Sequence, residues 1–336
     1  MKRYLIFSLA VLASLTMGCR RNRPQPRPTL PLVLSVAADT TGPGRVAAQA
    51  GKVGIPGHIV LFGEPSEVRT LAAAFQHADM LDNIDGRALR DSLPDFAGET
   101  VDGILDAAHA PYSQYLRPLA QADGLREAAV RGALFAWDSL SRAKVLVLTS
   151  PLHAAYGRFD IDTLQQLTGG VCPVLTPVEA CLQAALDGGA RHIAVWAPDT
   201  VRLSRAYESV FEEIGPAEAT LAVITPRPEQ DSCSALVSLL RQYPGTRLDA
   251  LVLDGYDGQP AEIQAAADSL FLSGAEEAAL LPPGFRILEP TRCLISATAA
   301  LLRSRNLYTH RIQRPATRFY TLTESDGELT YVPSIH

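Results

Sequence analysis

Polar side chains that could move a proton follow two apolar segments of the chain. Ser150 and His153 come just after one such segment, and Asp254 and Asp257 come just after another. A proton donor on one side of a pocket and a carboxylate on the other could act as general acid and general base. If both segments are strands that end at one cleft, these four residues are candidate catalytic residues.

The same residues also have a purely structural interpretation. His153 would then be a surface or loop histidine with its hydrogen bonds satisfied, and Asp254 and Asp257 would cap the next helix. For any single residue both interpretations stay open. Several polar residues at strand ends together favour a polar pocket.

Internal repeats indicate where the strands lie. Ile59–Ser66 resembles Ile193–Thr200, and Lys144–Ser150 resembles Asp249–Gly255. Each segment is a short apolar run that ends at a turn, and the runs are continuously apolar rather than alternating, as in parallel strands covered on both faces. The repeats predict two similar α/β halves.

Helical patterns separate these strands, which is typical of doubly wound α/β domains. The fold class predicted is therefore α/β, with two similar doubly wound parallel-sheet domains and a cleft between them. The expected helices are 66–77, 124–140, 177–186, 200–214, 232–243, 261–272 and 292–303.

Ligands of such folds bind at the carboxyl ends of the strands. The rule adds five candidate substrate-binding residues at or just after predicted strand ends, namely Glu64, Thr149, Thr176, Thr200 and Tyr256. The polar loop 82–99 could close over the pocket, or it could be a solvated connection.

The segment from Cys181 to Tyr207 is similar to the second half of the aspartate/glutamate racemase superfamily. A helix, a Gly-rich turn, a strand and a T-V-x-S-x-x-Y helix start occur in that order, and Ile287–Pro290 and Arg318–Thr321 resemble the closing helix and strand. The resemblance covers roughly residues 58 to 325 and implies the same two-domain fold, with a small carboxylate or amino acid as substrate.

The resemblance ends at the catalytic positions. Those racemases use two cysteines, one at a strand end in each half, and here the two positions are occupied by Ser150 and Gly255. A hydroxyl without a strong base cannot replace a thiolate, and glycine has no side chain. A two-thiol mechanism is therefore not expected, and any proton transfer would use oxygen or imidazole groups.

The N-terminus is typical of an export signal. Lys2 and Arg3 precede the nearly apolar stretch Tyr4–Leu15, which is too short to span a bilayer as a mature helix. Leu15–Cys19 resembles a bacterial lipobox, which implies lipidation at Cys19; the alternative is an ordinary signal peptide with an incidental cysteine. The Arg/Pro-rich residues 20–30 would be an extended tether.

These features predict a membrane-anchored lipoprotein of the cell envelope. The expected organisation is a signal peptide at 1–19, a tether at 20–30, a first domain at 31–170 and a second domain at 171–285. Residues 286–336 would form a helix and strands that return to the first domain.

Composition and motifs narrow the partners. Residues 30–336 carry 24 basic and 36 acidic residues, a formal net charge of −12, which argues against a nucleic acid partner. No Walker loop, dinucleotide fingerprint or metal-ligand spacing occurs, so neither a cofactor nor a metal is predicted. Cys181 and Cys233 are expected to be small buried residues, and the pairing of Cys172, Cys181, Cys233 and Cys293 stays open.

Three classes of function fit the sequence. The first is an isomerase-like or lyase-like enzyme that acts on a small carboxylate or amino acid. The second is a tethered solute-binding lipoprotein, since two α/β halves around a cleft also describe that class. The third is a racemase-like protein without catalysis that has a structural or interaction role.

Overall fold

A computed structural model describes residues 28–83, 85–116, 122–138, 140–225, 231–255, 260–309, 311–325 and 328–334. The predicted signal peptide, Cys19 and most of the tether lie outside these residues, as do Tyr256 and Asp257. No helix within the described ranges is long and apolar enough to cross a membrane.

The first sheet has six strands in the order β10-β9-β2-β1-β3-β4. All neighbours are parallel except β10 and β9, which form an antiparallel pair at the edge. Its strands are β1 (His58–Gly63), β2 (Thr100–Asp106), β3 (Ala143–Leu148), β4 (Val174–Leu175), β9 (Ala316–Ser325) and β10 (Glu328–Pro333).

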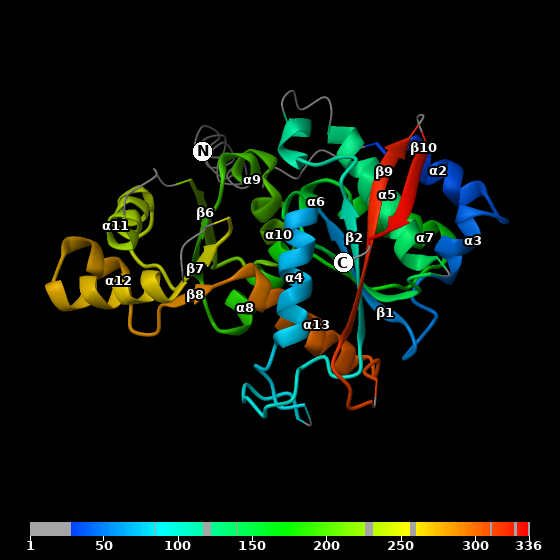
Figure 1. Cartoon of the computed structure of the whole chain (residues 1–336). Coiled ribbons are helices and arrows are strands. Elements are labelled where there is room, and N and C mark those ends of the chain that lie inside the picture. The colour runs from blue at the N-terminus through cyan, green and yellow to red at the C-terminus, as the bar shows by residue number, and fades with distance from the viewer. Residues whose placement is uncertain are drawn as a thin grey trace, which may run out of the picture.

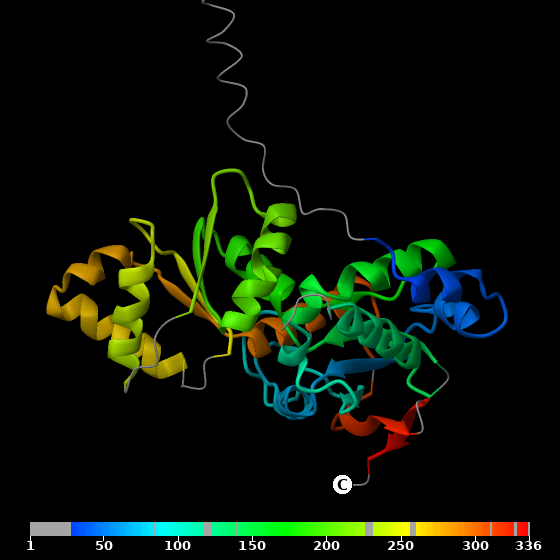
Figure 2. The same cartoon turned by 90° about the horizontal axis from the view of Figure 1, so that it is seen from above.

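The second sheet has four parallel strands in the order β6-β5-β7-β8. They are β5 (His192–Trp196), β6 (Thr220–Ile224), β7 (Ala250–Leu253) and β8 (Arg286–Leu288). β5 lies between β6 and β7 as β1 lies between β2 and β3, so the sequence repeats correspond to equivalent strands. The predicted pair of similar parallel-sheet domains is confirmed, and Figure 2 shows the two lobes side by side.

Helices cover both sheets, and several begin with proline at the first helical positions, where its missing N–H costs nothing. They are α2 (Pro31–Ala38), α3 (Pro43–Gln49), α4 (Pro65–His77), η1 (Tyr112–Leu116), α5 (Ala122–Trp137), α6 (Leu152–Ala155), α7 (Arg158–Thr168), α8 (Pro177–Asp187), α9 (Asp199–Ser204), α10 (Ala206–Ile214), α11 (Ser232–Gln242), α12 (Pro260–Ser273), η3 (Glu276–Leu280) and α13 (Pro290–Ser304).

The helix expected over 200–214 is interrupted. Arg205 has a φ of 57°, in the left-handed region, so α9 ends there and α10 starts in a new direction. Because of this break, Thr200 and Val201 line the cleft, while Tyr207 lies in the core. Hydrophobic spacing alone did not indicate this break, and Leu203, near the end of α9, is exposed while Tyr207 and Val210 of α10 are buried.

Among the described strands, the chain passes between the two sheets twice. It leaves the first sheet after β4 and enters the second at β5 through α8, and it returns from β8 to β9 through α13. β4, at 174–175, therefore lies in the first sheet and β8, at 286–288, in the second, a few residues from the domain limits of 170 and 285 expected from the sequence. Figure 1 shows α8 and α13 between the two lobes.

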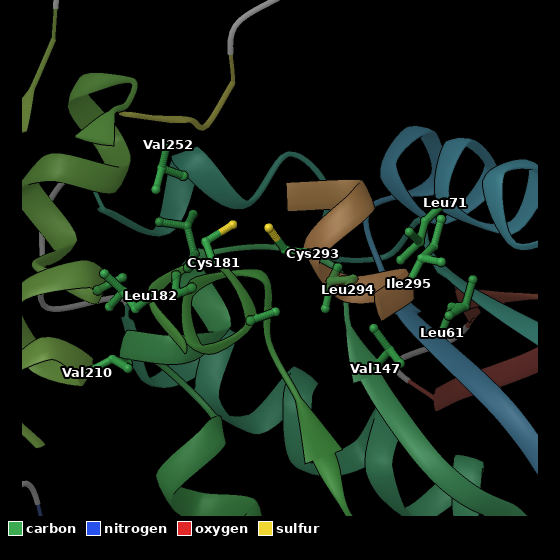
Figure 3. Close-up of a cluster of buried hydrophobic side chains, with 14 of the residues drawn as sticks. Leu61, Leu71, Val147, Cys181, Leu182, Val210, Val252, Cys293, Leu294 and Ile295 are labelled. Atoms are coloured by element: carbon green, nitrogen blue, oxygen red, sulfur yellow. The ribbon is translucent and has the colours of Figure 1, made fainter. Parts of the chain in front are cut away.

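One cluster of buried apolar side chains spans both domains. Leu61 and Val147 come from the first sheet, Val252 from the second, and Cys181 and Leu294 from the two connecting helices. Figure 3 shows the connecting helices between side chains of the two lobes. Because burying apolar surface stabilises the whole cluster, the two lobes are packed together around α8 and α13.

Candidate active site

A cavity of about 520 Å³ lies where the carboxyl ends of strands from both sheets meet. Its size is typical of a small-molecule site, and its place agrees with the strand-end rule for α/β folds. Residues predicted from the sequence that line it are Glu64, Thr149, Ser150, Thr200 and Asp254. Gly255, at the second racemase position, lines it as well.

Glu67 is a cavity residue that the sequence reasoning missed. It lies in the first turn of α4, and the Thr149 hydroxyl donates a hydrogen bond of 3.1 Å to its Oε2. Burial and then the nearby charge of Glu64 raise the pKa of Glu67 to about 7. A signal was present: a glutamate three residues after the N-cap at Glu64, the capping-box position, turns back toward the helix start.

Asp254 enters the same cavity from the other domain. It directly follows β7, and its backbone N–H donates to the Trp196 carbonyl at 2.8 Å, which extends the strand pairing to the rim. Burial raises the pKa of Asp254 to about 6, while the Tyr207 hydroxyl favours the carboxylate and limits the shift. The side chain predicted as a carboxylate at this strand end is therefore a buried acid that titrates near neutrality.

Glu67 and Asp254 form a pair of acids from opposite domains. The charge of Asp254 is among the causes that raise the pKa of Glu67, so the two groups interact across the cavity. Groups whose pKa values lie near neutral pH can hold or release a proton under working conditions. The arrangement can therefore supply one general acid and one general base to a ligand between the domains.

The charge of the cavity is negative at its side chains and positive at its helix ends. Glu64 and Glu289 line it beside Glu67 and Asp254, and no Lys, Arg or His among the described residues lines it. First-turn residues of α4, α9 and α13 also line it. Helix N-termini attract anionic groups, whereas the carboxylates attract cationic ones.

Two predicted residues lie outside the cavity. His153 is fully buried with its ring stacked on Phe62 and edge-on to Tyr112, and neither ring nitrogen has a hydrogen-bond partner within the described part of the chain. Burial lowers the pKa of His153 to about 4, so its ring is a neutral core side chain. Thr176 is buried and caps α8 by accepting a hydrogen bond of 3.2 Å from the Glu179 N–H.

The backbone conformation and the surroundings of Gly255 disfavour a cysteine at this position. Its φ is 71°, and a Cβ built on it would lie 2.8 Å from the Pro198 Cγ. A side chain at this position would meet both backbone strain and a close contact. The strand end is thus built for glycine, and Asp254, one residue earlier, is the ionisable group that the second domain brings to the cavity.

In the described ranges, no group of three or more His, Cys, Asp or Glu side chains is placed to hold a metal ion. The polar loop 82–99 begins beyond the C-terminus of α4, whereas Glu64 and Glu67 lie at the other end of that helix. A helix of 13 residues is about 20 Å long, so the loop does not lie over the cavity.

The sequence matches no protein-family model and no curated protein. Among solved structures, glutamate racemase isoform RacE1 from Bacillus anthracis matches over 80% of this chain and 90% of its own, with a TM-score of 0.50 and 16% identity. The protein has the racemase fold. At this identity the match concerns the fold alone, and it confirms the two-domain architecture that the sequence resemblance implied.

Two further structures with lower scores were found. Glutamate racemase from Francisella tularensis in complex with D-glutamate covers 81% of this chain and 90% of its own, with a TM-score of 0.48 and 16% identity. A variant of arylmalonate decarboxylase covers 72% and 93%, with a TM-score of 0.41 and 15% identity. In the present chain, Ser150 and Gly255, which the sequence resemblance places at the two cysteine positions of the racemases, both line the cavity.

Proposed function

We propose that the protein is an acid–base enzyme of isomerase or lyase type that transfers protons with Glu67 and Asp254. The observation that carries this proposal is a pair of cavity carboxyl groups, one from each domain, with pKa values of about 7 and about 6. Buried acids with raised pKa values, placed on two sides of a pocket, are typical of proton-transfer sites.

The lower pKa of Asp254 assigns the roles. Near pH 6.5 most Asp254 is a carboxylate and most Glu67 is a carboxylic acid. Asp254 removes the proton from the face of the ligand carbon that is turned toward the second domain. Glu67 donates its proton to the opposite face of the same carbon, from the side of the first domain. Exchange with solvent returns each group to its starting state. No thiol takes part.

The charges of the cavity favour an amino acid as substrate. The carboxylates of Glu64 and Glu289 suit an ammonium group, and the N-terminal turns of α4 and α13 suit a carboxylate. A second carboxylate on the ligand would meet the acidic side chains, and among the described residues no Lys or Arg lines the cavity to compensate its charge. Neutral or basic amino acids are therefore favoured over aspartate and glutamate.

Proton exchange tests this function directly. The purified protein is incubated in deuterated water near pH 6.5 with alanine, lysine or aspartate, and loss of the α-proton is followed by NMR. We expect exchange with alanine or lysine to exceed that with aspartate, and the E67Q variant, purified in parallel, to exchange at least about 10²-fold more slowly. Exchange in E67Q at the rate of the wild type would contradict the proposal.

A binding function is the second outcome of this experiment. The cavity combines acidic side chains and helix N-termini with two domains connected by helices, the arrangement of proteins that close around a solute. Retention of one amino acid without α-proton exchange would identify a tethered binding protein. Absence of both would favour a structural role.

We also propose that Cys19 anchors the protein to a membrane of the cell envelope. The export signal, the Gly18-Cys19 junction and the Arg/Pro-rich tether support this location. Cells that express the protein should incorporate an alkyne-labelled fatty acid into the wild type and into C233A, and not into C19A. Label in C19A would show that the fatty acid is attached to another residue and would contradict the proposal.

A further inference from the structure

Two cysteines face each other between the domains. Cys181 belongs to α8 and Cys293 to α13, and both are buried, with 0% and 6% of their surface exposed. Figure 3 shows the two sulfur atoms pointing toward one another from the two helices. The thiols are free in this structure, and the neighbouring Cys181 thiol lowers the pKa of Cys293.

The topology gives this pair an unusual place. α8 and α13 are the two connections by which the chain passes between the sheets, as described above. A covalent bond between them would tie the outgoing and the returning connection at one point. It would hold the two domains in one relative position.

We propose that Cys181 and Cys293 form a reversible disulfide that staples the two connections between the domains. Cys233, which the sequence analysis expected to be buried, is exposed at the first turn of α11, and Cys172 is buried in the core of the first domain. Neither belongs to α8 or α13. The proposed pairing is therefore specific to the interdomain helices.

The chemistry is thiol–disulfide exchange with a small soluble disulfide. Cys293 is the attacking thiol, since the neighbouring Cys181 thiol lowers its pKa. Its thiolate attacks one sulfur of the reagent and displaces one thiolate, giving a mixed disulfide. Cys181 then loses its proton and attacks the Cys293 sulfur, which displaces the second thiolate. Two protein thiols are oxidised, one reagent disulfide is reduced to two thiols, and the two protons leave with them.

The staple would act on the cavity through α13. Glu289, Pro290, Thr291 and Leu294 surround Cys293 in sequence, and all four line the cavity. Fixing α13 against α8 therefore fixes one wall of the cavity relative to the second domain. Oxidation would therefore hold the cleft at one width, and reduction would allow that width to change.

The test uses the full chain with bis(hydroxyethyl) disulfide as the oxidant. After reaction, free thiols are blocked under denaturing conditions and proteolytic peptides are analysed by mass spectrometry. We expect one linked peptide pair containing Cys181 and Cys293, lighter by about 2 Da than the sum of the two reduced peptides. The loop closed by this bond is long, so Tm should rise by roughly 3–6 °C and return to its original value on reduction.

Matched single variants define the outcome. C181A and C293A should lose both the linked peptide and the rise in Tm, whereas C172A and C233A should keep both. Alanine is small and apolar, so these variants retain the packing of a buried position better than a polar replacement does. If Cys181 and Cys293 are both recovered as free thiols, or are linked only to Cys172 or Cys233, the proposal is wrong.

Discussion

Replacing Glu67 with glutamine is expected to lower kcat by about 10²- to 10⁴-fold, the usual loss when a general acid or base is removed. Glutamine keeps the size of the side chain and can still accept the hydrogen bond from Thr149, so the cavity stays intact. D254N should cause a loss of similar size. The measurement is the initial rate of α-proton exchange at saturating amino acid.

The pH profile of this reaction separates catalysis from structural damage. Below about pH 6 Asp254 becomes protonated and the base is lost, and above about pH 7 Glu67 becomes ionised and the acid is lost. The rate should therefore be bell-shaped, with its maximum between these values. E179Q is the matched control, because burial also raises the pKa of Glu179 but its side chain does not line the cavity. Equal losses in E67Q and E179Q would contradict the assignment.

Replacing Lys144 with methionine is expected to destabilise the protein by about 3–5 kcal/mol, the cost of leaving one buried charge without its partner. The Lys144 Nζ lies 2.6 Å from the Glu99 Oε2, and both side chains are fully buried. Lys144 also donates to the carbonyls of Ile55 and Leu307, at 3.1 and 2.7 Å. The pair thus joins β3, the residue before β2 and the segment after α13.

Urea unfolding measures this loss, and two further variants make it specific. The K144M/E99Q double variant should lose much less than K144M, because the amide is neutral and can still accept the hydrogen bond from the Thr309 N–H. R202M removes an exposed ion pair of 2.9 Å with Asp199 and should cost less than about 1 kcal/mol. A double variant as unstable as K144M would show that the lysine acts through packing rather than through its charge.

The sequence was sufficient to predict the fold, because the features that determine it are local. Ile193–Trp196 and Val145–Leu148 are apolar at every position, a pattern typical of a strand covered on both faces. The repeat of these strands predicted equivalent places in two sheets. The carboxyl ends of parallel strands in such a fold meet at one place, so Thr149, Ser150 and Asp254 could be predicted to share a site.

The tertiary structure alone decided which polar groups are available for chemistry. His153 and Ser150 are three residues apart, yet one is a core side chain between Phe62 and Tyr112 and the other lines the cavity. The sequence did not single out Glu67, but burial in the folded protein raises its pKa. Burial and pKa depend on atoms brought near from distant parts of the chain, and residue type and spacing do not contain that information.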